Sequence, residues 1–276
     1  MTEVPVNTIP LFDPLDKKLV ELLRSLTPEE WELPTVAKQW NVKDVAAHLL
    51  DTNIRAISSG RDHYKGVFIN NVHSFGDLVA ALNGLNADWV KAMKRVSPAV
   101  LTEWLETSGR QYSALMAAAD LQAPAPIAVA WAGDEESPNW FHIAREYTEK
   151  WHHQQQIRDA VGIPGIMTHE LYYPVLDTFM MALPYTYRNV PALNGTVVQV
   201  TISGDGGGHW FLAHHGKWIL SKTNDAPVTA YTTISGAAAW KLFTKSWRRK
   251  DIAPYVSIEG DKELGEVVLE MISVMA

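Results

Sequence analysis

The sequence predicts a multi-domain protein of the α and α+β class, in which a helical bundle precedes a small α+β domain. Two observations lead to this prediction. Helical periodicity fills the first two-thirds of the chain, and short β-rich runs split by Gly-rich turns begin near residue 190. We therefore divide the chain into a helical bundle at 1–188 and an α+β domain at 189–276.

Six helices are expected in the first part, because apolar residues recur there at spacings of three and four. Two of their start points carry capping signals. Asn41 is followed three residues later by Asp44, as in a capping box, and Ser97 precedes Pro98 at a helix start. The expected helices are 14–26, 41–60, 74–96, 97–119, 137–162 and 169–183.

Short strands are expected in the second part, with a helical segment after Ser235 and a closing helix at 262–275. The Gly-rich stretch 204–208 lies between two strand patterns and is not followed by a helix. It therefore predicts a hairpin turn rather than a phosphate-binding loop. The expected strands are 195–204, 209–216, 217–222 and 255–261.

Composition and charge exclude several classes of protein. Hydrophobic residues make up 47% of the chain and charged residues 20%, which is typical of a globular protein with a sizeable core. The formal charge is −7 and the longest basic run is the short "KSWRRK", so no basic face for a nucleic acid is expected. Without a signal-peptide pattern or an apolar run of ~20 residues, we expect a cytoplasmic protein with no membrane partner. The oligomeric state is left open.

The chain contains no cysteine. No disulfide can stabilise the fold, no cysteine nucleophile exists, and any metal must be held by nitrogen or oxygen ligands. A thiol that takes part in the chemistry would have to come from a cofactor.

Residues 145–160 read "REYTEKWHHQQQIRDA", a polar run that raises the possibility of a metal site. Glu149 and His153 are four residues apart, so a helix places them on one face, and both are metal-ligand types. His152 is three residues from Glu149 and competes with His153 for the same role. The alternative interpretation is an ordinary solvated face of a helix.

His48 is the candidate for a third ligand. Its neighbours on the expected helix are apolar, so its side chain should point at or beside the core. The alternative for His48 is a hydrogen-bonded core histidine.

Two stretches resemble the DinB-like, mycothiol-dependent maleylpyruvate isomerase family. They are "WELPTVAKQWNVKDVAAHLL" (31–50) and "WAGDEESPNWFHIAREYTEKWHH" (131–153), which place His48 in the first motif and Arg145, Glu149 and His153 in the second. The resemblance implies a four-helix bundle that binds one divalent metal through these two histidines and the glutamate. The later stretches "VTAYTTISGAAAWKLF" and "VSIEGDKELGEVV" are similar to the sterol-carrier-like C-terminal domain of that family. The sequence departs from the family pattern where "HHQQQ" replaces a Trp–Asp-like pair.

The resemblance and the ligand set together predict an enzyme. Two histidines and one carboxylate with open positions are the ligands of a catalytic metal site, most typically zinc. We expect a thiol-dependent transferase or cis–trans isomerase, using mycothiol, bacillithiol or glutathione on a small-molecule electrophile. Arg145 is the candidate to bind an acidic group of the substrate, although it fits an ordinary surface arginine equally well.

Two other functions remain open from the sequence. The same metal site with water in place of a thiol would give a hydrolase. A non-enzymatic alternative makes the second domain a carrier of a hydrophobic ligand, with Phe211, Trp218 and Ile219 lining its cavity.

Overall fold

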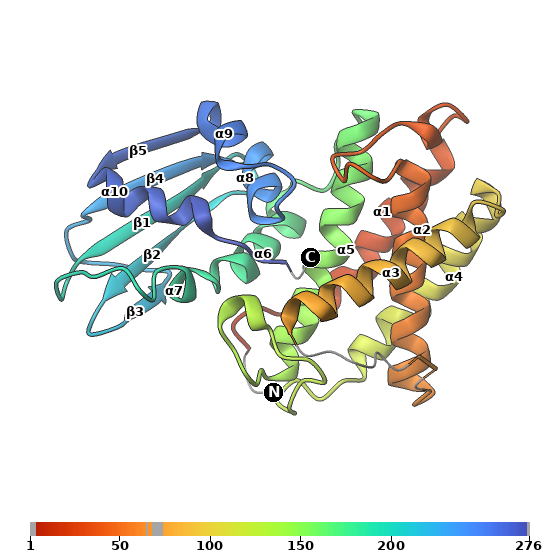
Figure 1. Ribbon diagram of the computed structural model, residues 1–276, viewed down its shortest axis with the longest axis horizontal. Coiled ribbons are helices and arrows are strands. Elements are labelled where there is room, and N and C mark those ends of the chain that lie inside the picture. The colour runs from red at the N-terminus through yellow and green to blue at the C-terminus, as the bar shows by residue number, and fades with distance from the viewer. Residues whose placement is uncertain (1–3, 65, 68–73, 275–276) are drawn as a thin grey trace. The chain divides into compact units, whose positions relative to one another are not determined.

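The computed structural model describes residues 4–64, 66–67 and 74–274. It confirms the predicted fold class, because a helical region is followed by a domain built on a five-stranded sheet (Figure 1). Within the described residues, no helix has both the length and the apolar composition needed to cross a membrane.

The chain forms two compact units, and each is discontinuous in sequence. The first, here called the helical unit, comprises Thr8–Asp120 and Glu149–Ile166. The second, here called the sheet unit, is made mainly of Leu121–Thr148 and the chain from Met167 onward. The long helix α5 (Asn139–Val161) contributes to both. The expected division between residues 188 and 189 falls inside the sheet unit, between α7 and β1, and as a statement about independently folding domains it stays a prediction.

The helical unit packs around α2, which begins with the expected capping box. The Asn41 side chain accepts a hydrogen bond from the Asp44 backbone, and the Asp44 side chain accepts one from the Asn41 backbone. Val45 and Leu49 in the apolar stripe of α2 are fully or almost fully buried against α3 and α4, and they share one hydrophobic cluster with leucines of α1. The helices are α1 (Phe12–Ser25), α2 (Val42–Ala56), α3 (Phe75–Met93) and α4 (Pro98–Ala117), with a π-helical turn at Ile57–Arg61.

The second half of α5 is buried in the helical unit although it is polar. The Lys150 side chain is only 2% exposed, and its Nζ lies 2.8 and 2.9 Å from the two carboxylate oxygens of Asp16 on α1. The same ammonium lies 4.7 Å from the centre of the Tyr112 ring. Arg158 donates a hydrogen bond to the backbone oxygen of Lys18 at 2.9 Å. The interpretation of this stretch as a solvated helix face is therefore wrong.

The sheet unit contains one sheet with strand order β3-β2-β1-β4-β5. All neighbouring pairs are antiparallel except β1 and β4, which are parallel and register Val198 against Ala230. The expected hairpin turn at 204–208 joins β1 to β2. The elements are α6 (His169–Met180), α7 (Leu183–Thr186), β1 (Val197–Ser203), β2 (Gly208–His214), β3 (Trp218–Ser221), β4 (Ala230–Ser235), α8 (Gly236–Phe243), α9 (Arg249–Ile252), β5 (Val256–Gly260) and α10 (Lys262–Glu266).

One expectation for the sheet unit is wrong. The closing helix is short, because α10 passes into a 3-10 turn at Val267–Glu270 and the chain then bonds elsewhere. Ser273 donates its N–H to the Phe243 backbone oxygen and its hydroxyl to the Phe179 backbone oxygen, which a continuing helix would prevent.

The residues suggested for a hydrophobic-ligand cavity do not form one wall. Trp218 is buried and packs against Tyr187, whereas Ile219, its neighbour on β3, points to the opposite face and is 41% exposed. These residues serve partly as core and partly as surface.

The buried ion pair of Lys150 with Asp16 gives a test of the helical unit. Replacing Asp16 by alanine leaves a buried ammonium without its carboxylate, which should lower the free energy of unfolding by about 3–5 kcal/mol. Urea denaturation followed by circular dichroism measures this. The matched control is Arg24→Ala, which breaks the exposed pair with Glu106 and should cost at most about 1 kcal/mol. Equal losses in the two variants would contradict the role assigned to the buried pair.

Candidate metal centre

His48 lies in the middle of α2, where the stripe of apolar side chains directs it inward. Its ring packs against Trp40, with 4.8 Å between ring centroids, and meets the His153 ring edge-on at 4.7 Å. Its Nδ1 atom is buried and has no hydrogen-bond partner among the described residues. A buried nitrogen without a hydrogen-bond partner lowers the free energy of unfolding, so we expect a bound group to contact this atom.

One turn of α5 places Glu149, His152 and His153 together. The Glu149 Oε2 atom lies 3.6 Å from His152 Nδ1 and 3.7 Å from His153 Nε2. Ligand atoms of these three residues all lie within 4.8 Å of one another, close enough to hold a metal ion. Both histidines are buried, and the glutamate is partly exposed. The i,i+3 and i,i+4 spacing therefore produces a compact group of one carboxylate and two imidazoles.

A neighbouring amide orients the His153 ring. The Nδ1 atom of His153 lies 2.9 Å from Gln156 Oε1, one turn later on α5. Because the amide oxygen only accepts, this contact places the ring proton on Nδ1 and leaves the Nε2 lone pair directed toward Glu149. A hydrogen bond of this kind fixes the tautomer of a metal-ligating histidine.

Burial keeps the two inner histidines neutral. It lowers the pKa of His48 well below the ordinary value, and the nearby His153 and Arg55 lower it further. Burial and the adjacent His152 likewise lower the pKa of His153, although the hydrogen bond to Gln156 opposes this shift. Neutral imidazoles can ligate a metal at neutral pH without first losing a proton.

Arg145, the predicted substrate-binding residue, lies one turn before Glu149 on α5 but belongs to the sheet unit. It is buried rather than a surface arginine. Its Nη2 atom lies 2.5 Å from His142 Nδ1 and 2.9 Å from Glu146 Oε1. Its Nη1 atom is buried and unpaired among the described residues. Part of its hydrogen-bonding capacity is therefore unused.

The sequence reasoning missed Trp40 and Gln156 and left His152 as a competitor only. Trp40 stands immediately before the cap of α2, and its ring lies against both His48 and His153, with 6.3 Å between the centroids in the second case. The i,i+3 spacing of His153 and Gln156 was readable as a helical pair. Nothing in the local sequence indicated that Trp40 would cover a histidine pair.

The donor set fits a divalent transition metal. One carboxylate and imidazole nitrogens suit zinc and related ions, and an orphaned His48 nitrogen stands beside the group. The structure thus places the His48 ring against the His153 ring, whereas the residues whose ligand atoms all lie within 4.8 Å of one another are Glu149, His152 and His153. The ligand role of His48, Glu149 and His153 stays a prediction.

The fold and the cluster define a class: a helical bundle with a buried His–Glu group suited to a metal, joined to a small α+β unit. The family model of the mycothiol maleylpyruvate isomerase N-terminal domain matches residues 12–158, more than half of the chain. The chain belongs to this family, as its two motifs indicated.

The chain is also similar to curated relatives in sequence and to solved structures in fold. Two uncharacterized proteins of Mycobacterium tuberculosis, one from each of two strains, are 31% identical over 155 residues. The match covers 54% of this chain and 54% of theirs, so the chain spans about half the length of the curated relatives it matches. Crystal structures of a mycothiol-dependent maleylpyruvate isomerase and of a histidine-to-alanine variant match with TM-scores of 0.50 and 0.54. They cover 91% of both chains at 9% and 10% identity, so the likeness shows the fold.

The lowered histidine pKa values predict how the metal-free protein responds to acid. Below pH ~6.5 the unfolded chain takes up protons that His48 and His153 resist in the folded state, so stability falls as pH falls. With a chelator present, each histidine should remove up to about 1.4 kcal/mol of unfolding free energy per pH unit below that point.

Urea denaturation between pH 7.5 and 5 measures the slope. In the His48→Gln variant the unfolding free energy should fall less steeply as the pH is lowered. The His215→Gln variant, which changes an exposed histidine, should keep the slope of the parent chain. A parent chain equally stable across this range would contradict the assignment of neutral, buried histidines.

Proposed function

We propose that the protein is a metal-dependent isomerase or transferase that uses a low-molecular-weight thiol and acts on a small acidic electrophile. The observation that carries the proposal is the contact of the His48 ring on α2 with the ring of His153 on α5, whose Nε2 atom lies 3.7 Å from Glu149 Oε2. Two chain segments about a hundred residues apart meet there with the ligand types of a catalytic metal site.

In this proposal His48, Glu149 and His153 hold one divalent ion, zinc. The buried walls of the site supply a low-dielectric setting, and Gln156 holds the His153 ring in one orientation. Three protein ligands leave a position for an exogenous molecule. A divalent ion held there would lower the pKa of an exogenous thiol and so would favour the reactive thiolate at neutral pH.

The thiol in this proposal is mycothiol. The family is described by that thiol, and the matching solved structures are of a mycothiol-dependent enzyme. The absence of cysteine from the chain agrees with an external thiol. Bacillithiol and glutathione carry the same reactive group and serve as comparisons.

Arg145 is proposed to bind a carboxylate of the substrate. Its buried, unpaired Nη1 offers a charge-assisted donor, and the family name indicates a carboxylate-bearing substrate, maleylpyruvate. Its contact with Glu146 holds the guanidinium in place before the substrate arrives.

The ligand assignment is tested by metal content. His153→Ala should lose stoichiometric zinc because it removes a ligand, whereas His152→Ala should keep it. Inductively coupled plasma mass spectrometry of protein purified in metal-free buffers gives the ratio. If His152→Ala lost the zinc and His153→Ala kept it, the ligand would be His152 and not His153.

The thiol assignment is tested with the cobalt-substituted protein. Titration with mycothiol should produce an intense sulfur-to-metal charge-transfer band, and turnover of maleylpyruvate should require the same thiol. Arg145→Gln should raise KM for maleylpyruvate without removing the band. A metal-loaded protein with no band and no turnover with mycothiol, bacillithiol or glutathione would favour the hydrolase instead.

A further inference from the structure

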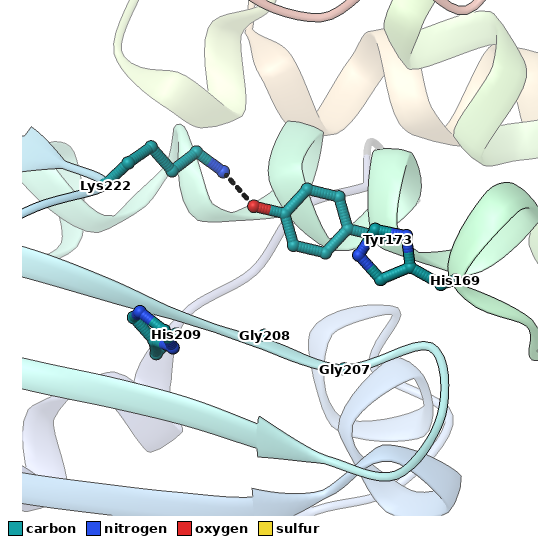
Figure 2. A pocket seen from close by; sticks show the side chains of 6 residues that line it. All are labelled: His169, Tyr173, Gly207, Gly208, His209 and Lys222. Carbon is teal, nitrogen blue, oxygen red and sulfur yellow. Dashed lines mark hydrogen bonds between the residues drawn. The ribbon is translucent and has the colours of Figure 1, made fainter.

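A second site lies entirely within the sheet unit, at the hairpin turn that joins β1 to β2. An open depression of about 390 Å³ is lined there by His169 and Tyr173 of α6, Gly207 of the turn, Gly208 and His209 of β2, and Lys222 (Figure 2). We call it the Lys222 pocket. None of the residues proposed for the metal centre contributes to it.

Stacked rings form one side of the Lys222 pocket. Tyr173 lies between His169 and Trp210, with ring centroids 4.6 and 5.5 Å away and interplanar angles of 16° and 20°. Figure 2 shows Tyr173 and Lys222 on one side of the depression and His209 with the two glycines on the other. Both faces of Tyr173 are covered in this stack and Trp210 is fully buried, so a flat ligand would meet the edges of the rings, an edge-to-face contact that π-systems also favour.

The strand approaches these rings closely because it carries no side chain at the contact. A Cβ atom on Gly208 would lie 2.6 Å from Cε2 of Tyr173, well inside van der Waals contact. Glycine therefore keeps the depression open where any other residue would fill it.

The remaining hydrogen-bond donors of the pocket favour a ligand with an acceptor group such as a carboxylate. The Lys222 Nζ atom donates to the Tyr173 hydroxyl at 2.9 Å and forms an ion pair with Asp177, which in turn accepts from Trp210 Nε1 at 2.7 Å. These two contacts use two of the three N–H donors of the ammonium, and one remains. Burial of about half the side chain lowers the pKa of Lys222 to about 8, so the ammonium form still predominates at neutral pH.

The two imidazoles add further donors. His169 and His209 make ring contacts with Tyr173 and Phe211, and neither ring forms a hydrogen bond with a described residue. A cationic ligand is disfavoured, because the Lys222 ammonium already lies 4.7 Å from the Tyr173 ring centre and 5.0 Å from that of Trp210. The volume is at the small end for ligand sites, which disfavours a long lipid chain.

We infer that the Lys222 pocket binds a small planar carboxylate, either an aromatic acid or a conjugated one. The acid group meets Lys222 and the imidazoles, and the flat part lies along the exposed edge of the stacked rings. This inference does not depend on the metal centre or on the proposed thiol chemistry.

Isothermal titration calorimetry of the full chain at pH 7 tests the inference with three probes. Cinnamate is planar and charged, cinnamamide is planar and neutral, and 3-cyclohexylpropanoate is charged without a flat ring. Cinnamate should bind at least about tenfold more tightly than either comparison compound, because each lacks one of the two contacts.

Three variants locate the binding. Lys222→Gln should weaken cinnamate binding at least about tenfold, and Lys222→Arg, which keeps the charge, should restore most of it. The matched control is Lys217→Gln, an exposed lysine before β3, which should leave the affinity within twofold. Circular dichroism verifies that each variant is folded.

Two results would overturn the inference. One is equal affinity of Lys222→Gln and Lys217→Gln for cinnamate, and the other is equal affinity of the parent chain for cinnamate and cinnamamide. His153→Ala should bind cinnamate like the parent chain, so a failure of the metal centre and a failure of the Lys222 pocket are distinguishable.

Discussion

Burial of a polar helix is the constraint on which the helical unit depends. The second half of α5 carries charged and amide side chains yet faces other helices, so each must find a partner inside the protein. Lys150 finds Asp16 on α1, and Arg158 finds a backbone oxygen of the same helix. These bonds fix α1 against α5 more specifically than apolar packing alone would, and His152 and His153 lie on the stretch of α5 between them.

The same burial also sets the protonation state and orientation of the histidines in the candidate metal centre. Removing water from His48 and His153 favours their neutral forms, while the ring of Trp40 and the amide of Gln156 limit how the imidazoles can turn. A carboxylate held beside neutral imidazole nitrogens is a combination of groups that suits a divalent cation. In the proposed function one divalent ion binds there and also activates the thiol, so the same residues serve both stability and chemistry.

Much of the fold was readable from the sequence, because caps and periodicity act locally. The capping box at Asn41 and Asp44 and the hairpin turn before β2 are predicted by their own residues. The i,i+4 pair of Glu149 and His153 was readable for the same reason. The burial of this pair was not readable from the sequence, because a polar helix is expected to face solvent unless its partners on α1 are known. The contacts of Trp40 and the short closing helix depend on residues far away in sequence, and no local pattern encodes them.

Sharing α5 between two discontinuous units has a consequence for the growing chain on the ribosome. His48 leaves the ribosome about a hundred residues before His153, an interval of roughly 5–20 s at ordinary synthesis rates. During this time α1, α2 and α4 can form, but Asp16 lacks its lysine and His48 lacks its neighbours on α5. The nascent bundle therefore lacks α5 until that helix has been synthesised. The first half of α5 then becomes part of the sheet unit. Assembly of the cluster is thus a late event in the synthesis of each molecule, and a metal ion arriving earlier would meet only one of the three proposed ligands.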